Sequence, residues 1–245
     1  MIPIRDTIPH RRTPYVTYAI IALNAVVFLY ELGLGPTALQ RFFMHYGIVP
    51  ARYADPRIAR HFGFVEQVTP FFTSMFLHGG FMHILGNMWM LWIFGDNVED
   101  WFGHAGLAAF YVFCGVASGL LHLMFNWGSP VPTVGASGAI AGVMGAYFLL
   151  YPRARVLTLV PIFFFLTFME LPAYFFLGLW FLLQFLSGTM AVAAGMAGGI
   201  AWWAHVGGFV AGAGVVFVLG GAKPRRPSGT RPTMKPLWEK VDEYW

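Results

Sequence analysis

The 245-residue chain is 58% hydrophobic and only 11% charged, with a formal net charge of +4, a pI of about 9.3 and a mean hydropathy of +0.63. Soluble domains carry about 25% charged residues, so this composition excludes an ordinary soluble protein and predicts an integral membrane protein. The single cysteine, Cys114, excludes a disulfide framework. The basic pI does not indicate nucleic-acid binding, because the basic residues flank apolar stretches, where they set membrane topology.

Intervals without Asp, Glu, Lys or Arg predict six membrane-spanning helices. Residues 13–30 and 67–95 each hold one span, because a span needs about 20 residues. The 52 residues of 101–152 hold two spans, separated by a Gly- and Pro-rich turn at 128–136. The 52 residues of 171–222 hold two more. The sequence therefore predicts an all-α membrane protein with a six-helix bundle.

The segments that interrupt these spans have their own patterns. The last two spans are expected to separate near 187–189 or 198–199, where Ser, Gly or Thr cluster. The apolar segment 156–169 is too short for a span and is predicted to be an interfacial or partly inserted connection. The long first loop, residues 33–70, carries large apolar residues at helical spacing, so we expect it to lie in the membrane interface. These residues are Leu39, Phe42, Phe43 and Tyr46.

The basic residues predict that both termini are cytoplasmic. With the N-terminus inside, 11 of the 15 Lys and Arg residues fall on the cytoplasmic side, and the other four lie in the long first loop, where the rule is weak. No signal peptide is expected, since the first apolar stretch is long and lacks a small-residue cleavage pattern. The predicted divisions are a cytoplasmic segment 1–14, a six-span domain 15–220 and a basic, Pro-rich cytoplasmic tail 221–245. Attachment to anionic lipids and disorder explain the tail equally well.

Three polar side chains in separate predicted spans share one depth. At the helical rise of 1.5 Å per residue, His83 lies roughly 18 Å, Ser137 roughly 22 Å and His205 roughly 24 Å above the cytoplasmic face. The helix from Ser137 to Pro152 is too short to cross the membrane, so the loop before it must dip inward and line a watery cavity. Ionisable groups at such depth are rare and often functional.

A serine and a histidine at one depth predict nucleophilic catalysis. The patterns Gly138-x-x-x-Gly142 and Gly208-x-x-x-Gly212 allow close helix approach, which brings His205 towards Ser137. A histidine kept neutral by desolvation can take the proton of a serine hydroxyl. Since the three helices carry no carboxylate at that depth, the expected site is a Ser–His dyad rather than a triad.

Donors for a tetrahedral oxyanion are available at the same place. His83 and Asn87 are four residues apart and share one helix face, and Ser137 contributes a free backbone N–H at a helix start. Gly135 and Gly138 leave room beside the serine for a substrate backbone. Taken alone, a Gly/Ala/Ser run in an apolar helix is more often a packing surface.

Three stretches carry these residues: His78-Gly79-Gly80-Phe81-Met82-His83-Ile84-Leu85-Gly86-Asn87, Gly135-Ala136-Ser137-Gly138 and Ala204-His205-Val206-Gly207-Gly208-Phe209. In this order they closely resemble the rhomboid family of intramembrane serine proteases, in its six-span bacterial type, over about residues 15–220. The resemblance implies a role for each candidate residue. Ser137 would be the nucleophile and His205 the general base, with His83, Asn87 and the Ser137 amide as oxyanion donors and His78, Gly135 and Gly138 in support.

The resemblance also implies the reaction and its setting. The reaction would be hydrolysis of a peptide bond in or next to a transmembrane helix of a membrane-protein substrate, within membrane lipid and without a metal or cofactor. The substrate would enter near the second and fifth helices, with the segment between the fifth and sixth as a movable cap, and a bacterial plasma membrane is the expected location. Some members carry an aromatic residue stacked on the histidine, where this chain has Ala141. The resemblance therefore does not identify what orients the His205 ring.

Three other functions are compatible with parts of the pattern. A catalytically silent rhomboid-like protein that binds membrane clients would share the fold. A metal site built from His78, His83, His122 and His205 is weaker, because no intramembrane carboxylate ligand accompanies these histidines and the His-Glu-x-x-His pattern is absent. A transporter is also disfavoured, because it would be expected to show internal repeats or paired broken helices, and the sequence predicts one broken entry rather than two. His122 and Gln184 are predicted to be structural, the latter through an interhelical hydrogen bond.

Overall fold

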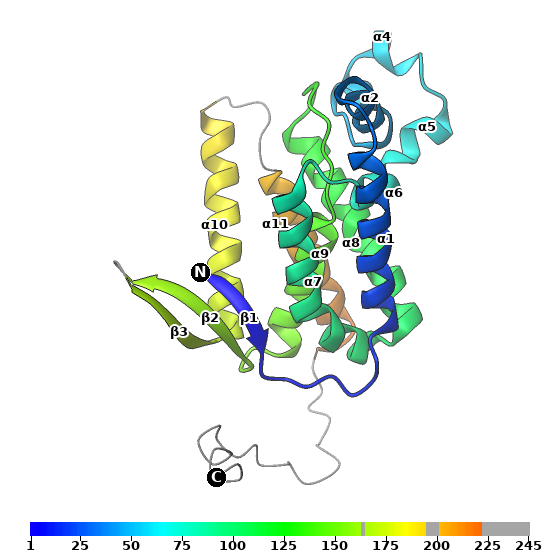
Figure 1. Ribbon diagram of the computed structural model, residues 1–245. Coiled ribbons are helices and arrows are strands. Elements are labelled where there is room, and N and C mark those ends of the chain that lie inside the picture. Colours follow the sequence, from blue (N-terminus) through cyan, green and yellow to red (C-terminus); the bar gives the residue numbers. More distant parts are fainter. Residues whose placement is uncertain (163–164, 195–200, 222–245) are drawn as a thin grey trace, which may run out of the picture.

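In the part of the chain that the structure describes, six helices of 14 or more residues run side by side and form the body of the protein (Figure 1). The computed structural model describes residues 1–162, 165–194 and 201–221. The predicted break near 198–199, the cap segment around it and the tail from 222 onward lie outside the described residues. The long helices are α1 (Tyr15–Leu32), α7 (Phe81–Phe102), α8 (His104–Phe125), α9 (Ser137–Leu150), α10 (Ala173–Ala193) and α11 (Trp202–Val218).

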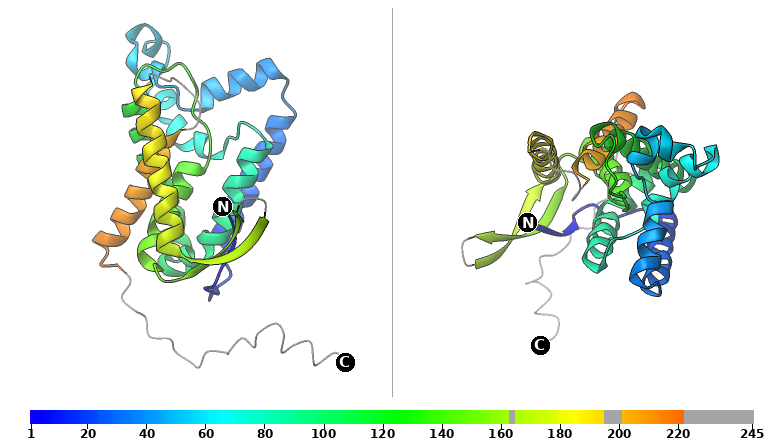
Figure 2. Two further views of the ribbon diagram at one scale, coloured as in Figure 1. Left: turned by 90° about the vertical axis from the view of Figure 1, so that its left-hand side faces the viewer. Right: turned by 90° about the horizontal axis from the view of Figure 1, so that it is seen from above.

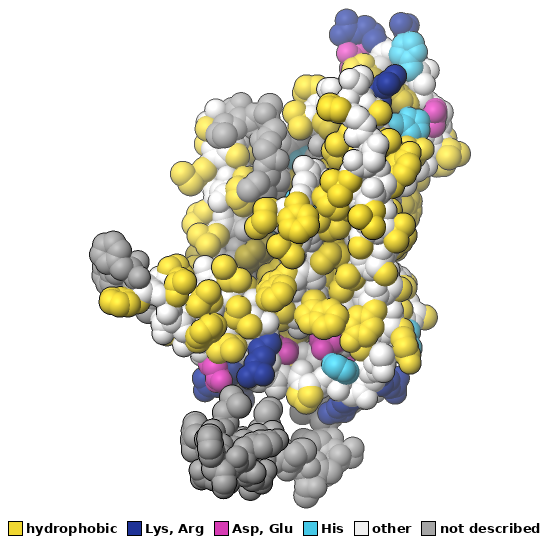
Figure 3. Space-filling model, viewed as in Figure 1, with side chains coloured by type: hydrophobic (Ala, Val, Ile, Leu, Met, Phe, Trp, Pro, Cys, Tyr) yellow, Lys and Arg dark blue, Asp and Glu magenta, His cyan; other side chains and the backbone are white. Residues whose placement is uncertain are grey.

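The helices are those of a membrane protein. Helices α1, α8 and α10 are long and apolar enough to cross a membrane, whereas α9 and α11 are apolar but shorter. In the space-filling view, hydrophobic side chains cover the middle of the visible face, while charged side chains gather at its two ends (Figure 3). Such a belt leaves the apolar surface facing lipid and the charges facing water.

Helix α9, the shortest of the six, forms the centre of the bundle. All its residues from Gly138 to Tyr147 are buried, with α7, α8 and α11 packed around it. A Cβ on Gly208 would overlap the carbonyl oxygen of Gly138, and one on Gly212 would overlap that of Gly142. The predicted close approach through these glycines is therefore confirmed, and it sets α11 directly against α9.

The prediction of an all-α protein is wrong in one region. Strands β1 (Ile2–Asp6), β2 (Arg155–Ile162) and β3 (Phe165–Pro172) form an antiparallel sheet in the order β1-β2-β3. The described parts of the stretch 156–169, which was predicted to be an interfacial connection, thus lie in the paired strands β2 and β3, which project beside α10 (Figure 2). An apolar run of this length fits a strand pair as well as a lipid-facing loop, and pairing with β1 decides between them.

Two predicted span boundaries also need correction. The span predicted at 67–95 begins only at Phe81, because the preceding residues form short helices of the first loop, and it continues to Phe102. The predicted break at 187–189 does not occur, since α10 runs unbroken to Ala193. The first loop contains α2 (Pro36–Tyr46), as its helical spacing predicted, followed by α3 (Ala51–Ala54), α4 (Pro56–Ala59), α5 (Phe64–Val68), α6 (Pro70–Thr73) and the 3₁₀ turn η1 (Ser74–Phe76).

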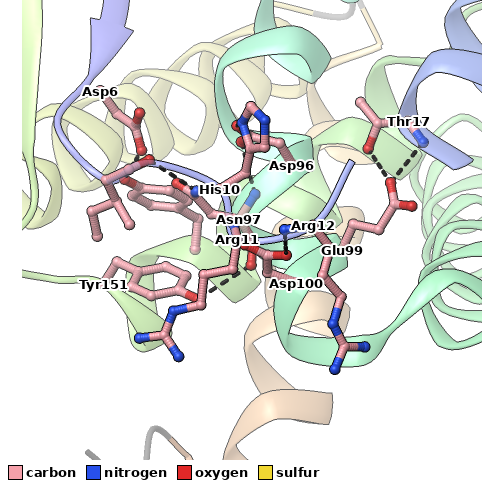
Figure 4. A network of polar contacts seen from close by, with 12 residues as sticks. Asp6, His10, Arg11, Arg12, Thr17, Asp96, Asn97, Glu99, Asp100 and Tyr151 are labelled. Atoms are coloured by element: carbon pink, nitrogen blue, oxygen red, sulfur yellow. Dashed lines mark hydrogen bonds and ion pairs between the residues drawn. The ribbon is translucent and has the colours of Figure 1, made fainter. Parts of the chain in front are cut away.

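The acidic end of α7 remains helical because the N-terminal segment satisfies its carboxylates (Figure 4). Glu99 accepts hydrogen bonds from the N–H groups of Val16 and Thr17 at 2.9 and 2.8 Å, and from the Thr17 hydroxyl at 2.7 Å. It therefore caps the start of α1, where free N–H groups favour a negative charge. The Asp100 carboxylate accepts hydrogen bonds from the backbone N–H groups of Arg11 and Arg12.

Candidate active site

The hydroxyl of Ser137 and the imidazole of His205 meet at the interface of α9 and α11. Ser137 Oγ lies 2.8 Å from His205 Nε2, a hydrogen-bonding distance. Both side chains are half-buried. The structure thus brings together the two residues that were predicted to share one depth on separate spans.

Ser137 is the first residue of α9, and the loop before it is held in place by backbone hydrogen bonds. Ile48 and Thr133 exchange N–H···O bonds of 3.0 and 2.8 Å, and the Gly135 N–H donates to the Ser74 carbonyl at 2.9 Å. The first N–H groups of a helix lack intrahelical acceptors, and the helix dipole favours negative charge near them. The Ser137 backbone N–H is therefore available to a developing anion beside Oγ.

His83 of α7 reaches the same place through the gap left by Gly135. A Cβ on Gly135 would lie 2.7 Å from His83 Nε2, and the φ of +131° at Gly135 is one that side-chain-bearing residues rarely adopt. On its other side, His83 Nδ1 accepts the N–H of Gly79 at 3.4 Å. A neutral imidazole that accepts at Nδ1 carries its proton on Nε2, so the donor nitrogen of His83 lies next to the Ser137 loop.

Asn87 and His78 form a buried pair below His83. Asn87 Nδ2 lies 3.0 Å from His78 Nε2, and the rings of His78 and His83 meet edge to face with centroids 5.1 Å apart. The His78 backbone N–H donates to both carboxylate oxygens of Glu31 at 3.2 Å. The amide of Asn87 has two N–H donors, so the contact with His78 leaves one for another acceptor.

The site contains one cavity of about 590 Å³, whose polar lining residues include His83, Asn87, His122, Ser137 and His205. His122 of α8, predicted to be structural, faces this cavity and pairs its Nε2 with the Thr133 hydroxyl at 2.6 Å. Gly138, the residue after Ser137 in α9, faces α8, where a Cβ would overlap the Ser118 hydroxyl. Among residues 1–162, 165–194 and 201–221, no cluster of three or more His, Cys, Asp or Glu residues has metal-binding geometry.

Gln184 of α10 is a site residue whose partner could not be read from the sequence. Its Oε1 lies 2.6 Å from His205 Nδ1, so the predicted interhelical hydrogen bond exists and its partner is the candidate base. Gln184 is the only amide or acidic side chain between Glu170 and Lys223. A lone polar residue in a charge-free span indicated that Gln184 makes a hydrogen bond, but the identity of its partner depends on how α10 packs against α11.

Comparison with known proteins identifies one family. The family model described as the rhomboid domain matches residues 65–222, which hold all the candidate site residues. Rhomboid protein 1, mitochondrial, of Saccharomyces cerevisiae is 28% identical over 150 residues, which cover 59% of this chain and 39% of the yeast protein. Rhomboid protease GluP of Bacillus subtilis is 30% identical over 134 residues, covering 54% of this chain and 24% of that protein.

A third relative shows the same extent of similarity. Presenilin-associated rhomboid-like protein A, mitochondrial, of Danio rerio is 29% identical over 146 residues, covering 58% of this chain and 34% of the fish protein. The matched region thus spans less than half the length of each of these three relatives.

Proposed function

The chain belongs to the rhomboid family, and we propose that it is an intramembrane serine endopeptidase that cleaves a peptide bond in or beside a transmembrane helix of membrane-protein substrates. The observation that carries this proposal is the 2.8 Å separation of Ser137 Oγ and His205 Nε2 at one cavity. A nucleophile within hydrogen-bonding distance of a base is the arrangement that covalent catalysis requires. The membrane setting follows from the apolar helices around the site.

Acylation would proceed through the two side chains in contact. As Ser137 Oγ attacks the scissile carbonyl carbon, His205 Nε2 takes the hydroxyl proton, and a C–O bond forms while the carbonyl π electrons move to oxygen. The imidazolium of His205 then gives this proton to the leaving amine nitrogen as the C–N bond breaks. An ester between Ser137 and the acyl part of the substrate remains.

The oxyanion of the tetrahedral intermediate would be stabilised by donors from two helices. The Ser137 backbone N–H would come from the start of α9, and the His83 Nε2–H from α7, next to Gly135. Asn87 would supply an amide N–H from the same face of α7 as His83. Removing one such donor costs about 10²- to 10³-fold in rate in other hydrolases. The half-buried position makes these hydrogen bonds stronger than they would be in water.

Hydrolysis of the ester needs water, which a cavity of about 590 Å³ with several polar side chains in its wall can hold. His205 would take a proton from this water as it attacks the ester, and return it to Ser137 Oγ as the C–O bond breaks. The chain's own residues therefore suffice for the complete cycle.

We place all six long helices across the membrane, with both termini on the cytoplasmic side. The start of α1 and the end of α11 lie at the same end of the bundle (Figure 1), which agrees with the excess of basic residues predicted for that side. A bacterial plasma membrane is the proposed location, supported by the similarity to the Bacillus subtilis protein. The yeast and zebrafish relatives are named as mitochondrial proteins.

A cleavage assay in proteoliposomes tests the proposed function. Purified wild-type protein, Ser137→Ala and His205→Ala are incubated with a fluorescent transmembrane-helix reporter, each with and without a chelator. We expect the wild type to cleave the reporter equally in both conditions and each variant to lose at least about 10³-fold in kcat. A fluorophosphonate reagent, which requires an activated serine, should label the wild type but not Ser137→Ala.

A serine outside the cavity provides the matched control. Ser187→Ala, on α10, should retain both cleavage and labelling. Wild-type protein that neither cleaves the reporter nor reacts with the reagent would instead support a client-binding protein. Cleavage lost only with the chelator would support a metal site, and labelling that persists in Ser137→Ala would contradict the assignment of the nucleophile.

A further inference from the structure

Gln184 is a buried polar residue on an otherwise apolar stretch of α10. Its side chain is 8% exposed, and its carbonyl oxygen Oε1 lies 2.6 Å from His205 Nδ1. The other ring nitrogen of His205, Nε2, lies 2.8 Å from Ser137 Oγ. The three side chains therefore form one continuous line of hydrogen bonds from α9 through α11 to α10.

The contact between Gln184 Oε1 and His205 Nδ1 determines which ring nitrogen of His205 carries the proton. A neutral histidine carries one proton, and it can accept the serine proton at Nε2 only if its own proton is on Nδ1. A carbonyl oxygen next to Nδ1 accepts that N–H and so selects this tautomer. If the Gln184 amide pointed its NH₂ group at Nδ1, the ring proton would move to Nε2, and His205 would be unable to act as a base.

The other groups around His205 do not supply such an acceptor. Trp180 and Trp202 lie near the imidazole, with ring centroids at 5.8 and 6.5 Å, but an indole N–H can only donate. Across the cavity, the titratable groups that face His205 are His83 of α7 and His122 of α8. No carboxylate lines the cavity in the part of the chain that the structure describes.

We propose that Gln184 is a positioning residue that holds His205 in the Nδ1–H tautomer and aims Nε2 at Ser137. This inference rests on the proposed function, which makes His205 the base. Gln184 would then fill the place that a carboxylate occupies in a Ser–His–Asp triad, but without a charge. Ala141 has no aromatic ring to stack on His205. The residue that orients His205 would thus come from α10.

Two substitutions of similar size separate positioning from packing. Gln184→Met keeps the volume but removes the acceptor, so we expect kcat to fall about tenfold or more with little change in KM. Gln184→Glu keeps the acceptor and adds a charge that stabilises the imidazolium. We expect it to retain most of kcat and to move the acid limb of the kcat/KM profile upward by about one pH unit or more.

Readouts that do not depend on peptide cleavage keep this test independent of the proposed function. The first is the rate of fluorophosphonate labelling of Ser137 as a function of pH. As for kcat, this rate should fall in Gln184→Met, whereas in Gln184→Glu it should be mostly retained with its acid limb at higher pH. The second is the ¹⁵N spectrum of labelled histidine, assigned with His205→Ala, which should show the Nδ1–H tautomer in the wild type and a changed tautomer population in Gln184→Met. Thr189→Val, which removes a hydroxyl from the exposed side of α10, is the matched control and should match the wild type.

The outcomes distinguish the two proposals. Wild-type kinetics, pH profile and tautomer in Gln184→Met would overturn the role of Gln184, as would a loss of activity in Gln184→Glu with the acid limb unmoved. A wild-type protein that shows the Nδ1–H tautomer and labels at Ser137 but cleaves no reporter would overturn the endopeptidase function and leave the role of Gln184 standing.

Discussion

At the scale of single residues, Gly135 has the most restrictive position near the candidate site. Its φ of +131° excludes most side chains, and a Cβ there would lie 2.7 Å from His83 Nε2 and 2.8 Å from Cε1. Both constraints act on the loop between the candidate oxyanion donors. A side chain at this position would therefore push His83 away from Ser137.

We expect Gly135→Ala to lower kcat by at least about tenfold, because the methyl group displaces one oxyanion donor. The reporter assay measures this loss. Gly128→Ala is the matched control, since Gly128 also has a positive φ, of +82°, but a Cβ there would face open space. Equal activity losses in the two variants would contradict the argument, because they would trace the effect to backbone strain alone.

At the scale of elements, the contact of α9 with α11 sets the distance between the serine and the histidine. The two backbones touch at glycines, so a side chain added at one of these glycines requires the two helices to shift apart. Overpacking of this kind costs about 1–3 kcal/mol, whereas Gly→Ala in a helix with free space gains up to about 1 kcal/mol.

Gly212→Ala should therefore destabilise the protein by about 1–3 kcal/mol and reduce activity, because its methyl group would overlap the Gly142 backbone. Gly214→Ala, two residues along the same helix and facing open space, should be neutral or slightly stabilising. Thermal unfolding in detergent compares the two. A Gly212→Ala protein as stable as the wild type would show that the helices separate without cost.

The strand β1 is joined to the bundle by a half-buried carboxylate, that of Asp6 (Figure 4). Asp6 accepts a hydrogen bond of 2.5 Å from the Tyr147 hydroxyl, and burial raises the pKa of Asp6 to about 6, with a smaller contribution from Asp96. Because the folded-state pKa lies above the ordinary value of 3.8, folding favours the protonated carboxyl. This stability is fully present below about pH 4 and is lost as the pH rises through about 6.

We expect Asp6→Asn to be more stable than the wild type at pH 7, by ~1 kcal/mol after allowance for solvent screening, and equally stable near pH 4. Unfolding midpoints measured across this pH range provide the comparison. Glu170→Gln replaces an exposed carboxylate of the same sheet and should leave the pH dependence unchanged. A wild-type protein whose stability rises between pH 4 and pH 7 relative to Asp6→Asn would reverse the sign and contradict this account.

At the scale of the whole molecule, charged residues gather at the two ends of an apolar bundle (Figure 3). The exposed Arg12 precedes α1 at one end, and the exposed Arg60 lies in the first loop at the other. The native Cys114 is fully buried and should not react with a thiol reagent, so labelling of an introduced cysteine reports the accessibility of that position.

We expect a membrane-impermeant maleimide to label Arg60→Cys in intact cells, and to label Arg12→Cys only after the membrane is opened. This result follows from cytoplasmic termini and an odd number of spans between the two positions. The wild type, with Cys114 alone, should remain unlabelled in both conditions. Labelling of both variants from the same side would refute the proposed topology.

Much of this architecture could be predicted from the sequence because it depends on local pattern. Charge-free intervals predicted the helices, and the Gly/Pro turn predicted that a helix begins at Ser137. The small-residue spacing predicted the approach of α9 and α11. The end of α7 was predicted too early, because the partners of Glu99 come from residues more than 80 positions away.

By itself, the sequence determined that this is an apolar helical protein with the rhomboid motifs, since composition, helical period and motif spacing are properties of neighbouring residues. Only the tertiary structure decided that β2 (155–162) pairs with β1, that Ser137 and His205 lie at contact distance, and that Gln184 faces His205 Nδ1. Each of these features joins segments far apart in the chain. Their partners are selected by how the helices and strands pack, which no local pattern records.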